Sequence, residues 1–307
     1  MDNFSWKNFV ELVKQDESGL FSKARGYASK YVPSYLYKYT SFPQREQDID
    51  SRIEQLVQGE LWLSKRFILN DPFELFMVSI DNSSKEAREY YNNVMNEKEI
   101  ACFSTSGTNK LMWAHYANSH KGFCIKFKRS PFSLVFPVEY VSQKVNMSYL
   151  YENFYKMKGD LFSKDKKRRE EAEKLAFCLE PIFYYKDIVW QYESEMRIVR
   201  PQPNNDNAMG HLHSLYDLGL EIDSFICGIN ASCETKNLLQ SLCKKINHVK
   251  RKNIMEKLLN SGEKVSEAEV HGFILEKKYC NEKYVSLYSI SLCDDLSLKE
   301  NLLWEER

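Results

Sequence analysis

The stretch ACFSTSGTNKLMWAHYANSHKGFCIKF, residues 101–127, predicts a strand, a polar turn, a short helix and a second strand in one run. The first strand is expected to end at Ser104, where the polar turn begins. Asn109 is placed to cap the helix, because its side chain can accept backbone N–H groups of the first turn. Gly122 then leads into a strand at Phe123–Phe127, whose alternate apolar residues share a face. Polar groups at a strand end beside aromatic side chains are typical of a small-molecule cleft.

The short helix carries Trp113, His115 and Tyr116. Two interpretations stay open for these side chains. Aromatic residues at helical spacing are commonly part of a core, and a single His is commonly a satisfied buried polar group. The same three side chains could instead line a ligand site at the end of the strand.

Composition bounds the class of protein. The chain has 307 residues, is 43% hydrophobic, and has equal numbers of basic and acidic side chains, 43 each. A net charge of zero does not indicate a general electrostatic attraction to nucleic acid. The eight cysteines include no C-x-x-C pair, and several lie in apolar runs, as buried free thiols do. The sequence has no secretory signal pattern and no apolar run of membrane-spanning length, so we expect a cytoplasmic protein with no membrane partner.

The pattern of elements predicts an α+β fold with a mixed, largely antiparallel sheet. Residues 1–34 are expected to form a helical N-terminal extension, and residues 35–293 a single α+β domain. Charged helical insertions are expected near 146–180 and 250–270, and a C-terminal tail over 294–307. The charged run in the first insertion is expected to be a solvated helix face.

The domain is expected to begin with a strand at Tyr35–Phe42. An apolar stripe from Ile49 to Val57 then predicts a helix that ends at Gly59, and a second strand follows at Leu61–Ser64.

Residues 65–74 read as a loop, because Asn70 and Asp71 precede Pro72 and favour a turn. Asp71 and Glu74 could bind a metal or polarise a substrate. The alternative is that Asp71 only fixes the loop through an Asx turn.

Further along, residues 83–98 predict a helix with a capping box from Ser83 and Glu86. Residues 182–200 are expected to return to strand. Alternation within that strand places Glu193, Glu195 and Arg197 on one face. Two carboxylates on an inner strand are costly to bury without a purpose, although Arg197 could merely neutralise them.

The last third of the chain is expected to contain a polar loop at 201–214, a strand at Ile222–Ile229, a helix at Ser232–Lys245 and a separate charged helix at Lys250–Glu269. His211 and His213 in the loop have no clear third ligand, so no metal is expected there. Terminal strands are predicted at Ile274–Leu275 and Val285–Ile290.

Five strings occur in order between Tyr37 and Val199: YKYTSF, NDPFE, ACFS, MWAHYANSHKGFCI and WQYESEMRIV. The resemblance that they carry spans about Tyr35–Ile229. In this combination the chain resembles the bacterial domain-of-unknown-function family DUF2971. The chain is also similar, more distantly, to ADP-ribosyltransferase-like folds. The similarity lies in the order of four segments: LYKYT, a helix that ends at a glycine, CFSTS and YESEMR. Those folds carry a catalytic Glu on a late strand, and many have His or Arg where this chain has Lys38.

The second resemblance implies an enzyme that uses NAD as a substrate, transferring ADP-ribose to a protein or nucleic acid acceptor, or hydrolysing NAD. It implies that Glu195 stabilises an oxocarbenium-like ribose and that Glu193 orients the acceptor. His115 would donate to the substrate. The implied cofactor-binding residues are Lys38, Tyr39, Asn70, Asp71, Ser104, Trp113 and Tyr116. A toxin or phage-defence role, with a neutralising or defence-system partner, would fit such a family.

Two other hypotheses stay open. A metal-dependent nuclease or hydrolase could use Asp71, Glu74, His115 and Glu195, although these four residues form no D-x-D or H-x-x-x-H motif. A non-catalytic binding or sensor module would suit the neutral charge and the 14% aromatic content.

Overall fold

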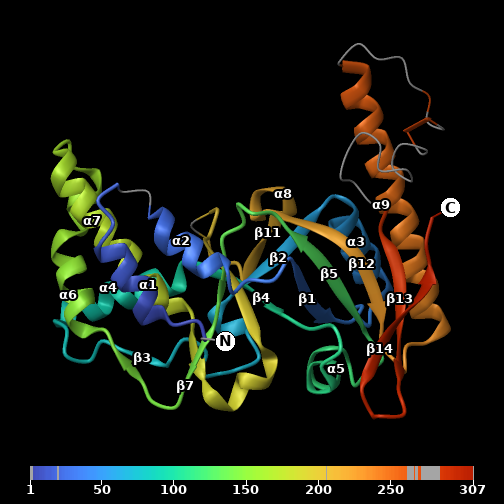
Figure 1. Cartoon of the computed structure of the whole chain (residues 1–307), viewed down its shortest axis with the longest axis horizontal. Helices are drawn as coiled ribbons and strands as arrows, with labels where there is room; N and C mark the ends of the chain where they lie inside the picture. The colour runs from blue at the N-terminus through green and yellow to red at the C-terminus, as the bar shows by residue number, and fades with distance from the viewer. Residues whose placement is uncertain are drawn as a thin grey trace. The chain divides into compact units, whose positions relative to one another are not determined.

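The computed structural model describes residues 3–18, 21–204, 206–260, 266, 269–270 and 284–306. It is a mixed α+β structure whose strands pair mostly antiparallel, as the sequence predicts (Figure 1). The residues group into two compact units that alternate along the chain, and each unit is described by itself. Unit 1 comprises Met1–Pro33, Trp62–Cys102 and Leu134–Leu212; unit 2 comprises Ser34–Leu61, Phe103–Ser133 and His213–Arg307.

Unit 1 contains most of the short helices. They are α1 (Trp6–Lys14), α2 (Ser22–Ser29), α4 (Lys85–Asn96), α6 (Ser148–Met157) and α7 (Lys166–Cys178), with 3-10 turns η1 (Arg66–Ile68), η2 (Lys158–Phe162), η3 (Glu180–Phe183) and η4 (Ile188–Glu193). Helix α1 buries Trp6, Phe9 and Val13 at helical spacing. It packs against α2 and α7, which are drawn at the left of Figure 1. The N-terminal helices predicted from the sequence are therefore part of the core of unit 1.

The strands of unit 1 are short. They are β3 (Val78–Ser79), β6 (Val135–Pro137), β7 (Glu139–Val141), β8 (Val145–Asn146), β9 (Tyr185–Asp187) and β10 (Glu195–Pro201); β2 (Glu60–Lys65), β4 (Lys98–Ser104) and β11 (Gly210–Ser214) cross a unit boundary. Strands β7 and β9 pair in parallel, with Tyr140 opposite Lys186. Strands β10 and β6 pair antiparallel, with Arg197 opposite Phe136. These two ladders bring the charged residues of β9 and β10 into the aromatic core of the unit.

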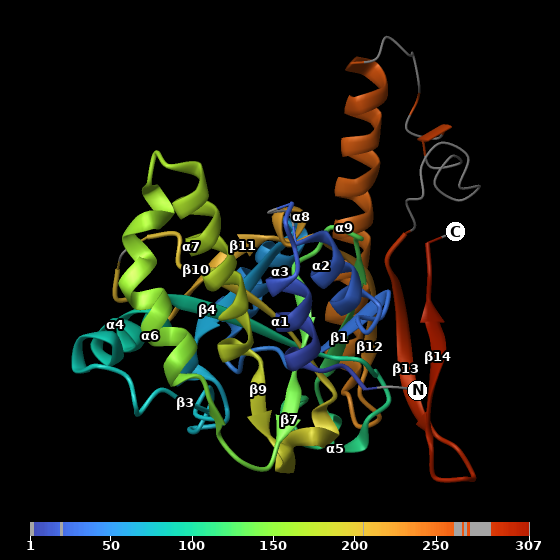
Figure 2. The ribbon, with the colours of Figure 1, turned by 60° about the vertical axis from the view of Figure 1, so that its left-hand side comes forward.

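Unit 2 is built on longer strands. They are β1 (Tyr35–Thr40), β5 (Phe123–Arg129), β12 (Leu220–Cys227), β13 (Ser286–Leu292) and β14 (Leu298–Trp304). Strand β5 pairs antiparallel with both β1 and β12, and β13 pairs parallel with β12. Phe123, Ile125 and Phe127 of β5 are fully buried, and the strand predicted at Phe123–Phe127 is confirmed. Figure 2 shows β13 and β14 as a red hairpin.

Four helices complete unit 2: α3 (Glu46–Val57), α5 (Lys110–Tyr116), α8 (Leu215–Leu218) and α9 (Cys233–Asn260). Gly59 follows α3 with a φ of 72°, the left-handed conformation that the predicted C-terminal cap requires. Asn109 caps α5, because its side chain accepts from the backbone N–H groups of Leu111 and Met112. Both local predictions are confirmed.

Several predicted boundaries are wrong. The helices expected at Ser232–Lys245 and Lys250–Glu269 are one helix, α9, as far as Asn260. Ser84 caps α4 in place of Ser83, and the side chain of Ser83 donates to the Ser148 carbonyl. No glycine or proline separates the two charged runs of α9, so nothing in the backbone ends the helix between them.

Three further differences concern strands. The loop expected at 201–214 contains β11, and the tail expected at 294–307 contains β14. The strand expected over 182–200 is divided into η3, β9, η4 and β10. The strand expected at Ile274–Leu275 lies outside the described residues. Among the described residues, no helix is long and apolar enough to cross a membrane.

Candidate functional site

A cluster of five charged side chains lies inside unit 1. Its members come from separate segments: Glu74 from the loop after η1, Lys186 from β9, Glu193 from the end of η4, and Glu195 and Arg197 from β10. All five are at most 5% exposed. We call these residues the buried charge cluster.

Lys186 lies among the three carboxylates of the cluster. Its Nζ atom is 2.5 Å from Glu193 Oε2 and 2.8 Å from Glu195 Oε2. It is also 3.5 Å from Glu74 Oε2. The ring of Trp190 lies over the same ammonium group, with 5.1 Å between Nζ and the ring centroid.

Arg197 binds two of the same carboxylates. Its Nε donates to Glu195 Oε1 over 2.6 Å, and its Nη2 donates to Glu74 Oε1 over 2.6 Å and to Glu195 Oε2 over 3.2 Å. Its Nη1 donates to the Phe183 carbonyl over 2.8 Å. The planar guanidinium therefore fixes the orientation of Glu195 through a two-point contact.

The local backbone explains how Glu193 and Glu195 come to share Lys186. Ser194 between them has a φ of 46°, in the left-handed region that is uncommon for residues other than glycine. This conformation ends η4 at Glu193 and starts β10 at Glu195. The sequence prediction that both lie on one strand is wrong for Glu193, because the chain turns at Ser194. The two carboxylates nevertheless meet on one ammonium group.

The charges of the cluster control the ionisation of its members. Burial favours the neutral form of Glu195, but Arg197 and Lys186 outweigh it and hold the pKa of that carboxyl well below its usual range. Burial likewise favours neutral Lys186, yet Glu195 and Glu74 raise the pKa of its ammonium group. Glu195 is therefore an ionised carboxylate in a low-dielectric interior. By formal charge, three carboxylates face two cations, which leaves an excess of one negative charge.

A hydroxyl also fixes the start of β10. The backbone N–H of Glu195 donates to the Tyr140 hydroxyl over 2.7 Å, and the backbone carbonyl of Glu195 accepts from the Val138 N–H over 3.0 Å. Tyr140 lies opposite Lys186 in the β7–β9 ladder. The main chain of Glu195 is thus held at both its donor and its acceptor.

In unit 2, Tyr39 and Trp113 hold the polar turn that follows β4. The Tyr39 hydroxyl donates to the Ser106 carbonyl over 2.7 Å, and the Trp113 indole N–H donates to the Gly107 carbonyl over 2.9 Å. Their rings meet edge to face with centroids 5.1 Å apart. Ser104 is fully buried, and its hydroxyl accepts from the Ser106 N–H. The structure thus brings Tyr39, Ser104 and Trp113 together around one turn.

The other predicted residues of unit 2 lie nearby in sequence. His115 is exposed and Tyr116 half-buried at the end of α5, with ring centroids 6.4 Å apart. Lys38 on β1 is half-buried, and its Nζ lies 5.6 Å from the centroid of the Phe103 ring. The assignment of these residues to NAD stays a prediction.

Asn70 and Asp71 lie in the loop of unit 1 that supplies Glu74. Asn70 is exposed. Asp71 is buried, and its side chain accepts from the Phe73 N–H over 2.9 Å, which is the Asx turn considered as the alternative for this residue. Asp71 therefore shapes the turn after which Glu74 enters the buried charge cluster. Its predicted contact with a cofactor stays a prediction.

The sequence analysis did not place Lys186 in the site, and it considered Glu74 as a metal ligand or a group that polarises a substrate but did not connect it with Glu195. A signal for Lys186 was present, because it is a single cation in the apolar run IFYYKDIVW. A buried charge needs a partner, so this lysine predicts a carboxylate elsewhere. Glu74 is 123 residues from Arg197, and no local pattern could connect them.

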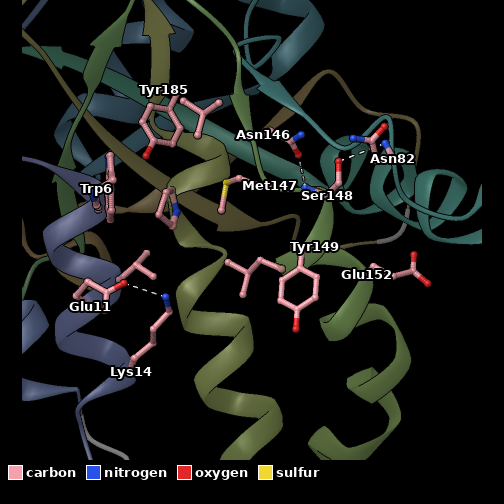
Figure 3. A pocket seen from close by; sticks show the side chains of 15 residues that line it. Trp6, Glu11, Lys14, Asn82, Asn146, Met147, Ser148, Tyr149, Glu152 and Tyr185 are labelled. Carbon is pink, nitrogen blue, oxygen red and sulfur yellow. Dashed lines mark hydrogen bonds and ion pairs between the residues drawn. The ribbon is translucent and has the colours of Figure 1, made fainter.

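Unit 1 also contains a cavity of about 760 Å³, which is shown in Figure 3. Trp6, Met147 and Tyr185 line it, and the ion pair between Glu11 and Lys14 lies at its edge. Its volume is in the range of small-molecule sites. None of the site residues predicted from the sequence is among its lining residues.

Within the part of the chain that the structure describes, no group of three or more His, Cys, Asp or Glu side chains is arranged to hold a metal ion. Residues 112–198 match the family model described as "Protein of unknown function (DUF2971)". This match confirms the family resemblance expected from the sequence over those residues, which include Trp113, Lys186, Glu193, Glu195 and Arg197. No curated protein and no solved structure was found to match the chain.

Proposed function

We propose that this protein cleaves the nicotinamide–ribose bond of NAD, passing ADP-ribose to an acceptor or to water, with Glu195 as the carboxylate that stabilises the reacting sugar. The observation that carries the proposal is the buried charge cluster. In it, an ionised Glu195 is oriented by Arg197 and Lys186 beside a second carboxylate, Glu193. Networks of this kind are expensive to bury and are characteristic of sites that handle charge.

The chemistry matches the charge of the cluster. When the C–N bond breaks, its electron pair leaves with nicotinamide, and positive charge develops on the ribose. A fixed carboxylate next to that sugar lowers the energy of the charged transition state without having to reorganise. The acceptor oxygen then bonds to the anomeric carbon and loses its proton. In this proposal Glu193 orients the hydroxyl of the acceptor.

Rigid support is the second element of the proposal. Glu195 is held through its side chain by Arg197 and Lys186 and through its backbone N–H by Tyr140. Catalytic groups act best when surrounding contacts fix them close to the productive geometry. The left-handed Ser194 supports the same view, because strained backbone often occurs at functional sites.

Release of nicotinamide from NAD by the purified protein tests the activity. Chromatography of the reaction separates nicotinamide from free ADP-ribose, and intact-mass measurement detects ADP-ribose on the protein. Free ADP-ribose in equal amount to nicotinamide identifies hydrolysis, and a deficit identifies transfer. A toxin or phage-defence setting predicts that expression lowers cellular NAD and slows growth.

A second candidate, a non-catalytic binding module, is favoured by one observation. The segment from η1 to β3 exposes three phenylalanine rings: Phe67 on η1 at 58%, and Phe73 at 70% and Phe76 at 48% in the loop that follows. The rings of Phe73 and Phe76 lie 6.3 Å apart between centroids, and exposed aromatic side chains of this kind suit a protein partner. Under this alternative the buried charge cluster would only brace the loop through Glu74, and Glu195→Gln would leave the biological effect intact.

A further inference from the structure

A small basic cavity lies in unit 1, apart from the buried charge cluster. Its volume is about 260 Å³. Helix α4, strand β3 and the loops around them form its walls; α4 and β3 are drawn at the left of Figure 2. The lining residues used below are Arg66, Arg88, Lys144, Asp81 and Tyr91.

Three cations and one carboxylate line the cavity. No ion pair is found for Arg66 or Lys144 within the described residues. Arg88 is oriented by the protein itself, because its Nη1 donates to the backbone carbonyls of Asp81 and Ser83. The Asp81 carboxylate accepts from the Ser79 hydroxyl over 2.7 Å. Positive charge therefore exceeds negative charge around the cavity by two.

Tyr91 provides an independent observation. Its side chain is 8% exposed, and its hydroxyl is buried with no hydrogen-bond partner among the described residues. Burial raises the pKa of Tyr91 to about 12, while the nearby charge of Arg66 acts in the opposite direction. The hydroxyl is therefore a protonated donor. A buried donor without a partner is destabilising, so its presence beside a basic cavity calls for an acceptor.

We propose that this cavity binds a phosphate group, with Arg66, Arg88 and Lys144 supplying charge and Tyr91 donating a hydrogen bond. Phosphate suits the site because it carries up to two negative charges and several acceptor oxygens. The volume is below the ~300–1,000 Å³ of sites that enclose whole ligands. It can hold the phosphate end of a small molecule, the rest of which would extend outside. The inference goes beyond the proposed function and stands without it.

Titration calorimetry in the absence of NAD tests the site, with inorganic phosphate and AMP as separate probes. Both are expected to bind. Arg66→Gln is expected to weaken both at least about tenfold, because a charged hydrogen-bond partner is lost. Tighter binding of AMP than of phosphate would identify a phosphorylated small molecule as the occupant. Equal binding would identify the free ion.

Tyr91→Phe separates ligand binding from packing. It removes only the unpaired hydroxyl, so the melting temperature is expected to stay equal or rise while phosphate affinity falls. Two matched controls lie on the same helix outside the cavity: Lys85→Gln, whose side chain is 78% exposed, and Tyr90→Phe. Both controls are expected to leave phosphate affinity unchanged.

Two results would overturn the proposal. The first is no detectable heat with either probe at concentrations of about 10 mM, which corresponds to negligible affinity. The second is binding that Arg66→Gln and Tyr91→Phe leave at the wild-type level. Because these measurements omit NAD, their outcome is independent of nicotinamide release.

Discussion

Arg197 and Glu195 lie two residues apart on β10, and the Nε of Arg197 donates to Oε1 of Glu195 over 2.6 Å inside the protein. Alternation along the strand puts both side chains on one face. The contact makes Arg197 the main support of the Glu195 carboxylate. It also means that the cluster responds as a unit when any member is changed.

Lys186→Met should destabilise the protein strongly. Lys186 contacts three carboxylates, and the substitution removes the ammonium group from all of them, while Arg197 still binds Glu74 and Glu195. Breaking a buried pair in this way costs about 3–5 kcal/mol. Denaturant unfolding at neutral pH measures the change. The matched control is Lys85→Met, which removes an exposed pair with Glu89 and should cost less than about 1 kcal/mol. Equal losses of unfolding free energy in Lys186→Met and Lys85→Met would contradict the claim that the buried charge cluster stabilises the protein.

Stability should fall in acid partly because of Glu195. Its pKa is lowered in the folded protein, so its contribution is complete above the usual Glu pKa of about 4.3 and is lost as the pH falls through the folded value. The unfolding free energy of Glu195→Gln should therefore start lower at neutral pH and decline less on acidification. Unfolding curves at a series of pH values show this. Parallel pH profiles of the unfolding free energy for the wild type and Glu195→Gln would rule out a contribution of Glu195 to acid sensitivity. The control is Glu89→Gln, at an exposed site.

His211 should contribute stability with the opposite pH dependence. Its ring contacts Glu99 at 2.5 Å and Asp206 at 3.1 Å, and these hydrogen bonds raise its pKa. The contribution is complete below the usual His pKa of about 6.5 and is lost as the pH rises through the folded value. Glu99→Gln should lower the His211 pKa measured by NMR titration. An unchanged titration midpoint would show that Glu99 does not hold the imidazolium.

Two glycines should respond oppositely to alanine. A Cβ atom on Gly122 would lie 2.3 Å from the Thr40 carbonyl oxygen, so Gly122→Ala should cost at least about 1–3 kcal/mol through overpacking. Gly26 lies in α2, and apart from its chain neighbours and the backbone of its own helix no atom lies within 4 Å of its would-be Cβ, so Gly26→Ala should stabilise by about 0.4–1 kcal/mol. Thermal unfolding compares the two. Destabilisation by Gly26→Ala would indicate a different environment for α2.

Local sequence patterns predicted much of the fold. The strand at β1, the helix that ends before Gly59 and the Asn109 cap each depend on residues a few positions apart, and all are present. The division of residues 182–200 was not predicted, because the left-handed turn at Ser194 has no sequence marker. Glycine or asparagine would have signalled such a turn, whereas serine does not.

Only the site residues that lie close together in the sequence could be predicted. The E-x-E-x-R alternation indicated Glu195 and Arg197, since a strand brings every second residue to one face. Glu74 joins them only through tertiary packing, and the apolar neighbours of Lys186 were its one visible signal. Tyr39 and Trp113 were predicted as a ligand wall, and the structure shows both holding the turn near Ser104. Aromatic spacing alone cannot distinguish these two uses.

The most direct test of the central claim is the rate of nicotinamide release by Glu195→Gln compared with Glu99→Gln. Both substitutions neutralise a buried carboxylate of unit 1, but only Glu195 belongs to the buried charge cluster. With folding verified by circular dichroism, Glu195→Gln should lose at least about 100-fold in rate, because a group that stabilises developing charge is removed. Glu99→Gln should stay near the wild-type rate. Release by Glu195→Gln at the rate of Glu99→Gln would contradict a catalytic role for the cluster.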